Sequence, residues 1–143
     1  MLKAVLDVGQ YVSAAIQGQG HPAQILMAWR EGLFELVTSD AILDDLRRVL
    51  CYPHIRKRHN WSDEQITLFV DSLALAATRT AGRLTVQVVK DDPTDNKILA
   101  CAEEGQVDYI VASDEHLTKL GTYAGIPIVT PRRFLELLQE DAV

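Results

Sequence analysis

The sequence predicts an α/β protein with a mostly parallel sheet and helices on both faces. Short apolar runs alternate with segments of helical spacing along almost the whole chain. Residues that cap or start helices follow several of these runs. The chain has 143 residues, 48% of them hydrophobic and 24% charged, which suits one domain with a substantial core. We therefore expect residues 1–143 to form a single domain.

The first half of the chain contains two predicted strands and three predicted helices. The strands are short apolar runs, and the helices repeat apolar residues every three or four positions. Ser39 or Asp40 can cap the second helix, Pro53 ends it, and Ser62 caps the third. These two helices follow each other without a strand and are expected to pack together. In order, the segments are strand 2–6, helix 22–30, strand 34–38, and the helices that follow Asp40 and Ser62.

The second half returns to strict alternation of strands and helices. Asp92-Pro93 starts a helix with proline at its first position, and Gly105 ends it. Ser113 is expected to cap a short helix that ends at Gly121, and Thr130 to cap the last helix. The strands are predicted at residues 84–89, 107–112 and 126–129, the first of them near a sheet edge.

Composition excludes several classes of protein. The net charge of −6 argues against broad, unaided binding to nucleic acid, which relies on a basic surface. No apolar stretch approaches the roughly 18 residues of a membrane span, and the first apolar run is too short for a signal peptide. Two cysteines do not make a disulfide framework. We expect a cytoplasmic protein that does not enter the membrane.

Four aspartates are the candidate site residues. In an α/β protein, ligands bind where strands end and the following helices begin, so acids at these positions converge. Asp7 and Asp114 follow predicted strands, Asp95 opens a helix, and Asp45 lies one turn into another. Converging carboxylates repel one another and need a hard cation such as Mg²⁺ or Mn²⁺. Each also has a plainer interpretation: a turn residue, a helix-dipole acid, a capping acid or a surface acid, respectively.

One basic patch stands out in this acidic chain. Residues 46–60 contain no acid. Such a patch beside an acidic site favours binding of a phosphate backbone, but a solvated helix face and loop explain it equally well. Its cations are Arg47, Arg48, Arg56, Lys57 and Arg58.

Other chemistries find little support in the sequence. There is no glycine-rich phosphate loop, and no cysteine–histidine pair has zinc-site spacing. A phosphotransfer receiver domain is an alternative α/β fold with clustered acids. However, the chain has only Asp7, and no adjacent acidic pair, at the end of the first strand.

The ordered motifs resemble the PIN-domain nucleases, and specifically the toxin components of prokaryotic toxin–antitoxin pairs. The resemblance covers nearly the whole chain and rests on the order and spacing of six segments. They are Ala4-Val5-Leu6-Asp7 with Val12-Ser13-Ala14, residues 34–39, residues 42–50, Asp91-Asp92-Pro93-Thr94-Asp95-Asn96-Lys97 through Ala100, residues 109–114, and residues 128–135.

The resemblance implies a three-layer α/β/α fold and a metal-dependent ribonuclease. Asp7, Asp45, Asp95 and Asp114 match the family's acidic quartet, and Asp45 stands where the family more often has glutamate. Asp7, Asp95 and Asp114 would hold Mg²⁺ or Mn²⁺, with Asp45 acting directly or through water. The family usually follows the first acid with Thr-Asn, whereas this chain has Val8-Gly9.

The resemblance also implies partners. RNA would be the substrate, with Ser113 or Thr94 at the phosphate or a metal-bound water, and the basic patch on the RNA backbone. A small antitoxin would block the acidic pocket. Family members often form homodimers, for which Ile66 and Phe69 are candidate contacts, although core packing explains them equally well. Because Val8-Gly9 lacks the polar pair, a PIN scaffold that binds a partner without catalysis is the alternative function.

Overall fold

The computed structural model describes residues 1–89 and 92–142, so Asp91 of the motif lies outside the described residues. The sheet has six strands in the order β3-β2-β1-β4-β6-β5. All neighbours pair in parallel except β5 and β6, which are antiparallel. The strands are β1 (Lys3–Leu6), β2 (Glu35–Thr38), β3 (Thr78–Arg79), β4 (Tyr109–Val111), β5 (Thr122–Tyr123) and β6 (Ile126–Val129).

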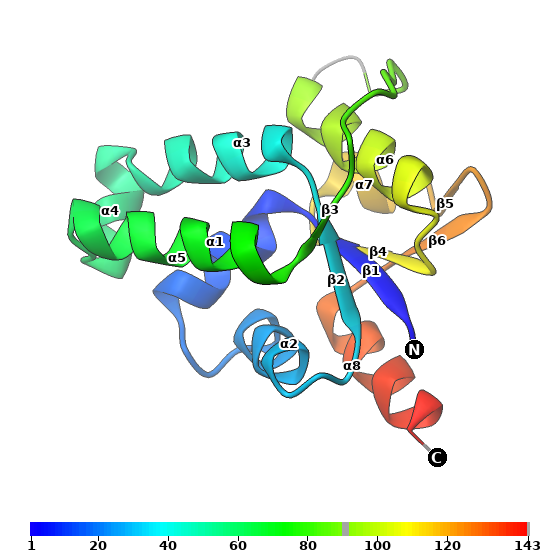
Figure 1. Cartoon of the computed structure of the whole chain (residues 1–143), viewed down its shortest axis with the longest axis horizontal. Coiled ribbons are helices and arrows are strands. Elements are labelled where there is room, and N and C mark those ends of the chain that lie inside the picture. The colour runs from blue at the N-terminus through cyan, green and yellow to red at the C-terminus, as the bar shows by residue number, and fades with distance from the viewer. Residues whose placement is uncertain (90–91, 143) are drawn as a thin grey trace.

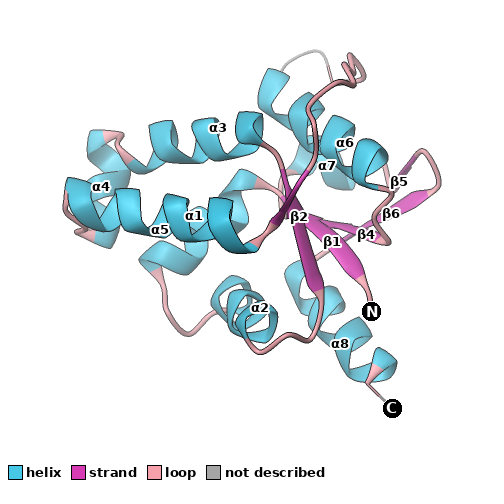
Figure 2. Cartoon of the chain, in the orientation of Figure 1, coloured by secondary structure: helices cyan, strands magenta, loops and turns pink. Residues whose placement is uncertain are grey.

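Helices cover both faces of this sheet (Figures 1 and 2). One face packs against α6, while α1, α2 and α8 lie on the other. The predicted α/β fold class is therefore confirmed. The helices are α1 (Val8–Ile16), α2 (His21–Arg30), α3 (Asp40–Leu50), α4 (Pro53–His59), α5 (Asp63–Ala76), α6 (Pro93–Gly105), α7 (Glu115–Thr118) and α8 (Pro131–Asp141).

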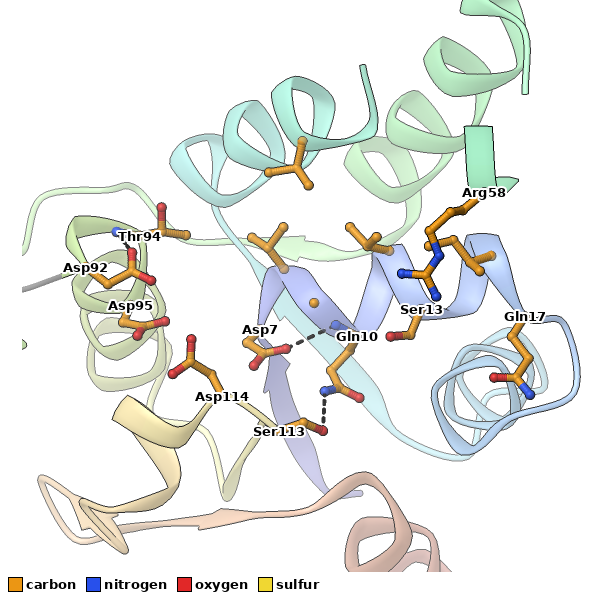
Figure 3. Close-up of a pocket in the computed structure, with 15 residues that line it drawn as sticks. Asp7, Gln10, Ser13, Gln17, Arg58, Asp92, Thr94, Asp95, Ser113 and Asp114 are labelled. Carbon is orange, nitrogen blue, oxygen red and sulfur yellow. Dashed lines mark hydrogen bonds between the residues drawn. The ribbon is translucent and has the colours of Figure 1, made fainter. Parts of the chain in front are cut away.

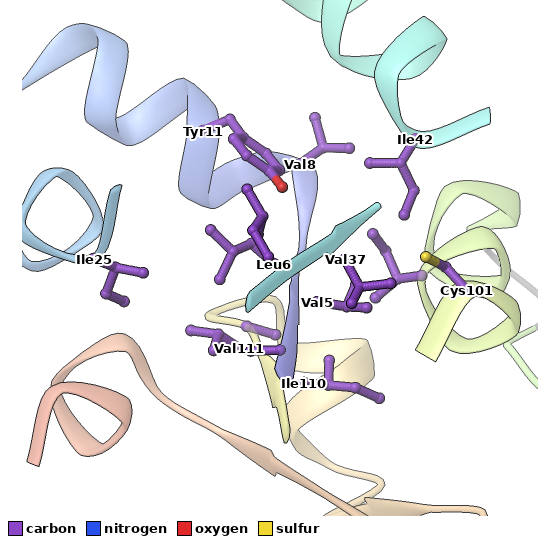
Figure 4. Packing of buried hydrophobic residues seen from close by; sticks show 14 of the residues in the cluster. Val5, Leu6, Val8, Tyr11, Ile25, Val37, Ile42, Cys101, Ile110 and Val111 are labelled. Atoms are coloured by element: carbon purple, nitrogen blue, oxygen red, sulfur yellow. The ribbon is translucent and has the colours of Figure 1, made fainter. Parts of the chain in front are cut away.

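Successive residues of the central strands feed the two layers of the core. Val5 and Ile110 face α6 and its Cys101, whereas Leu6 and Val111 face α1 and α2 (Figure 4). This alternation is why the central strands read as unbroken apolar runs: both sides of each strand are buried. Within residues 1–89 and 92–142, no helix is both long and apolar enough to cross a membrane.

Helices α3, α4 and α5 lie together beside the sheet (Figure 1). Ser39 caps α3 and Ser62 caps α5, as predicted. The guanidinium of Arg47 on α3 donates to Asp71 on α5 at 3.2 Å, so the two helices pack together as expected. Ile66 is 2% exposed and belongs to the core, which leaves it out of any contact between copies of the chain.

The predicted strand at residues 84–89 is wrong. Its backbone N–H groups are taken by side chains of α6 instead of a neighbouring strand. Glu104 accepts from the N–H groups of Arg83 and Leu84, and Asn96 accepts from those of Val88 and Val89. Residues 84–89 therefore form an extended segment along α6, called the strap below. The edge of the sheet is instead the two-residue strand β3.

Two helix boundaries also differ from prediction. Pro53 does not only end α3; it begins α4, because proline fits the first turn of a helix, where its missing N–H is not needed. Asp114, and not Ser113, caps α7, which ends at Thr118, before Gly121. Helix α1 was not predicted, because its start at Val8-Gly9 resembles a turn.

Candidate active site

A pocket of about 560 Å³ opens at the carboxyl ends of β1 and β4 (Figure 3). These adjacent strands are where the chain order of the sheet reverses, the place at which open α/β sheets bind ligands. Fifteen residues line the pocket: Asp7, Val8, Gly9, Gln10, Val12, Ser13, Ile16, Gln17, Val49, Arg58, Asp92, Thr94, Asp95, Ser113 and Asp114.

Asp7 connects β1 to α1 at the base of this pocket. Its Oδ1 accepts from the backbone N–H of Gln10 at 3.1 Å, which caps α1. Its own N–H donates to the carbonyl of Val111 on β4 at 3.0 Å. Only 5% of the residue is exposed, and this burial raises the pKa of the carboxyl to about 6, against hydrogen bonds from Gln10 that lower it. Capping of α1 explains why an aspartate stands at this position. Burial in the pocket makes ionisation of its carboxyl group unfavourable.

Helix α6 brings two more carboxyl groups to the pocket. Asp92 caps the helix by accepting from the N–H of Thr94 at 3.0 Å. Asp95, one turn on, is 3% exposed. Its Oδ2 is buried and has no hydrogen-bond partner among residues 1–89 and 92–142. Burial, followed by the charges of Asp114, Asp92 and Asp7, raises the pKa of Asp95 to about 7.

Asp114 faces Asp95 from the end of β4 (Figure 3). It caps α7, and its Oδ1 accepts from the N–H of His116 at 2.7 Å. Asp95, Asp114 and His116 each offer one ligand atom, and these atoms lie within 4.8 Å of one another. The sequence analysis missed His116, whose only signal is its place two residues after Asp114.

These residues fit a divalent cation. The buried Asp95 Oδ2 lacks a donor, and an unpaired buried carboxylate oxygen costs folding free energy. Burial raises the pKa of Asp7, and burial together with the charges of Asp114, Asp92 and Asp7 raises the pKa of Asp95, so ionisation of either carboxyl group is disfavoured. A hard cation relieves both conditions, and carboxylate oxygens are the ligands that Mg²⁺ and Mn²⁺ prefer.

Asp45, the fourth predicted acid, is not among the residues that line the pocket with Asp7, Asp95 and Asp114. It is 3% exposed on α3, and both of its oxygens accept from the ammonium group of Lys97 on α6, each at 3.1 Å. Arg48 donates to Oδ1 at 3.0 Å. Asp45 is therefore held by two cations, and Lys97, two residues after Asp95, ties α3 to α6.

The predicted substrate-binding residues fall into two groups. Thr94, Ser113 and Arg58 line the pocket with the acids. Lys57 is exposed and lies outside the pocket lining. The other three arginines hold carboxylates elsewhere: Arg47 that of Asp71, Arg48 that of Asp45, and Arg56 that of Asp63.

Gln10 is a second site residue that the sequence analysis missed. It is 2% exposed, and its Nε2 donates to the hydroxyl of Ser113 at 3.1 Å. Gln10 thus ties the segment that carries Asp7 to the segment that carries Asp114. The preceding pair supplies no polar side chain, since Val8 is buried and Gly9 has none. A polar residue one turn into α1, directly after an apolar residue and a glycine, was the available signal.

The parallel sheet, the pocket at its carboxyl edge and the converging aspartates define an α/β protein with an acidic, cation-fitting site. The PIN-domain family model matches residues 3–116, from β1 into α7, and the chain belongs to this family. PIN domains are in general metal-dependent nucleases, and the matched range includes all four predicted acids. A comparison with curated proteins finds no significant match. Family membership removes the phosphotransfer receiver as an alternative.

Proposed function

We propose that this chain is a Mg²⁺- or Mn²⁺-dependent endoribonuclease that hydrolyses phosphodiester bonds of single-stranded RNA. The observation that carries the proposal is the unpaired, buried Oδ2 of Asp95 in a pocket shared with Asp7 and Asp114. While Asp95 is ionised, that oxygen has no hydrogen-bond partner within the described residues, whereas a cation would give it one.

Asp7, Asp95 and Asp114 would hold the cation, and His116 stands within reach of the last two. A cation bound there would lower the pKa of a coordinated water and stabilise charge that develops on the phosphate. The chain's residues supply the rest. Because Asp7 and Asp95 are almost fully buried, a phosphate must enter the pocket to approach them, which favours a strand free of its complement.

Two hydroxyl groups are placed to bind the phosphate. Ser113 and Thr94 line the pocket beside the acids. The hydroxyl oxygen of Ser113 accepts from Gln10, so its proton remains free to donate to a phosphate oxygen. Asp45 acts indirectly in this proposal: its pairing with Lys97 fixes the first turns of α6, from which Asp95 projects.

The test is hydrolysis of a single-stranded RNA with Mn²⁺, compared between the wild-type protein and Asp7→Asn. Asn keeps the cap of α1 but removes a charged ligand. We expect cleavage by the wild type and its loss in the variant. Equal cleavage by both proteins would exclude this mechanism.

A second candidate is a PIN scaffold that binds RNA or protein without catalysis. Val8-Gly9 favours it, because both positions lack the side-chain hydrogen bonds that orient ligands, and such losses typically cost about 10–100-fold in metal affinity or activity. Calorimetry distinguishes the two: no heat of Mn²⁺ binding at millimolar metal would support the non-catalytic scaffold.

We further propose a role as the toxin of a toxin–antitoxin pair, acting on RNA in the cytoplasm. A small antitoxin would then block the acidic pocket. A homodimer is also proposed. With Ile66 in the core, its candidate contacts on α5 are the partly buried Phe69 together with Leu68 and Leu75, which are 70% and 88% exposed. A monomer mass in light scattering would count against the dimer.

A further inference from the structure

The pocket has a cationic end as well as an acidic one. Figure 3 shows Arg58, from α4, across the pocket from Asp92, Asp95 and Asp114, with α1 between them. Arg58 is the one lysine or arginine in the pocket lining, within the described part of the chain. A site for an isolated metal ion has no need of a guanidinium at its far end, whereas a phosphate-containing ligand does.

The ion pairs separate Arg58 from the rest of the basic patch. The guanidinium groups of Arg47, Arg48 and Arg56 already hold carboxylates, at 3.2, 3.0 and 2.6 Å. Arg58 has neither an ion pair nor a side-chain hydrogen bond with any residue in 1–89 or 92–142. Its planar group of donors is thus available to a ligand and matches the oxygens of a phosphate.

The surface between the two ends suits a nucleoside. Gly9 and Ser13 are exposed four residues apart, so they lie on one face of α1 with little side-chain bulk, and the exposed Gln17 follows at the C-terminal end of the helix. Ile16 and Val49 add an aliphatic wall. The nine residues of α1 span about 14 Å at about 1.5 Å per residue, so one phosphate cannot occupy both ends of a pocket that follows this helix.

We propose that Arg58 binds a second phosphate of the same RNA strand, at least one nucleotide away from the phosphate at the carboxylates. The inference rests on the proposed function in one respect: the strand is the proposed RNA substrate. The nucleoside between the two phosphates lies along α1, against the aliphatic wall. Substrates must therefore extend past the scissile phosphate, and a free mononucleotide leaves Arg58 unused.

The test measures binding without cleavage. A fluorescein-labelled single-stranded oligoribonucleotide is titrated in Ca²⁺, which accepts the same oxygen ligands, and anisotropy is followed over a range of salt concentrations. Each phosphate contact on a single strand contributes about 0.7 to the slope of log affinity against log salt. Arg58→Ala is expected to lower this slope by about 0.7 and to weaken binding by about tenfold.

Three comparisons make the result specific. Arg58→Lys keeps the charge and is expected to restore most of the slope. Arg30→Ala removes the same side chain from the exposed end of α2, away from the pocket lining, and is expected to leave the slope unchanged. Lys57→Ala, one residue from Arg58 but outside the lining, is expected to change the slope less than Arg58→Ala does.

An Arg58→Ala slope equal to that of the wild type would overturn the proposal, as would an equal fall in Arg30→Ala or Lys57→Ala. Failure of the proposed function gives a different result. Arg58-dependent binding without any cleavage in Mn²⁺ would remove the ribonuclease and leave this strand site in place. Cleavage in Mn²⁺ together with an unchanged salt slope in Arg58→Ala would support the ribonuclease and exclude the second phosphate site at Arg58.

Discussion

The carboxyl groups of this pocket have two opposite effects on the stability of the fold. Asp7, Asp92 and Asp114 each cap a helix, which stabilises the fold, yet Asp7 and Asp95 are buried beside other acids, which costs folding free energy without a cation. The helix N-termini α1, α6 and α7 converge here, and their positive ends offset part of that cost. The remainder appears as the raised pKa values of Asp7 and Asp95.

Asp7→Asn is expected to stabilise the metal-free protein at neutral pH. The pKa of about 6 in the folded state exceeds the ordinary 3.8, so the stability contributed by this carboxyl is full below about pH 4 and is lost as the pH rises through 6. The corresponding gain for the variant is up to about 3 kcal/mol at about pH 8. Urea unfolding in EDTA measures it.

The exposed Asp44→Asn is the control and is expected to show no such gain. The account of Asp7 fails if Asp7→Asn is less stable than the wild type at about pH 8, or if its advantage is as large at about pH 4 as at about pH 8.

Gln10→Ala tests the residue that ties Asp7 to Ser113. Loss of its hydrogen bond to Ser113 frees the segment that carries Asp114, so Mn²⁺ affinity is expected to fall about tenfold. Gln17→Ala, an exposed glutamine of the same pocket, is the matched control and is expected to retain wild-type affinity. Calorimetry reports both. Unchanged affinity in Gln10→Ala would show that Ser113 and Asp114 hold their places without it.

At the scale of elements, the chain's local signals set most of the architecture. Ser39, Ser62 and Thr130 cap helices as predicted, and proline at the first position marks α6 and α8. The strap at residues 84–89 was not predictable locally, because two side chains of α6 decide where its backbone hydrogen bonds go. Glu104 lies 20 positions from Leu84, and Asn96 lies 8 and 7 positions from Val88 and Val89. 

The candidate site, like the fold, was predictable only where its residues follow local signals in the sequence. Asp7 and Asp114 follow apolar strands, so their convergence was visible in the sequence, while the partners of Asp45 and the bond from Gln10 to Ser113 depend on contacts between distant segments. Arg58 was indistinguishable from its basic neighbours until the ion pairs of Arg47 and Arg56 were known.

Asn96→Ala is expected to release one end of the strap alone. The side chain accepts from the N–H groups of Val88 and Val89 at 3.0 and 2.8 Å and donates to the carbonyl of Val89 at 2.6 Å. Its loss should cost about 1 kcal/mol of stability and speed amide hydrogen exchange at Val88 and Val89. Exchange at Leu84, held by Glu104, should change little.

Glu104→Ala is the reciprocal variant, and it should speed exchange at Arg83 and Leu84 while sparing Val88 and Val89. Uniform acceleration along the whole strap in either variant would mean that the strap opens as one unit, contrary to this account.

On the scale of the whole molecule, the chain has a net charge of −6 and gathers carboxylates at one edge of its sheet. Arg58, the one arginine among the described residues that line the pocket, lies at the other end of the same pocket. Such a distribution repels a polyanion unless a cation neutralises the acidic end. Metal binding and RNA binding are therefore coupled in this account, and a bound cation also stabilises the fold by mass action.

Calorimetric titration with Mn²⁺ of the wild type, Asp95→Asn and the exposed-site control Asp44→Asn tests the central claim most directly. The account predicts binding by the wild type and by Asp44→Asn, and its loss in Asp95→Asn, whose buried Oδ2 is the unpaired ligand atom. No binding by the wild type, or equal binding by all three proteins, would contradict it.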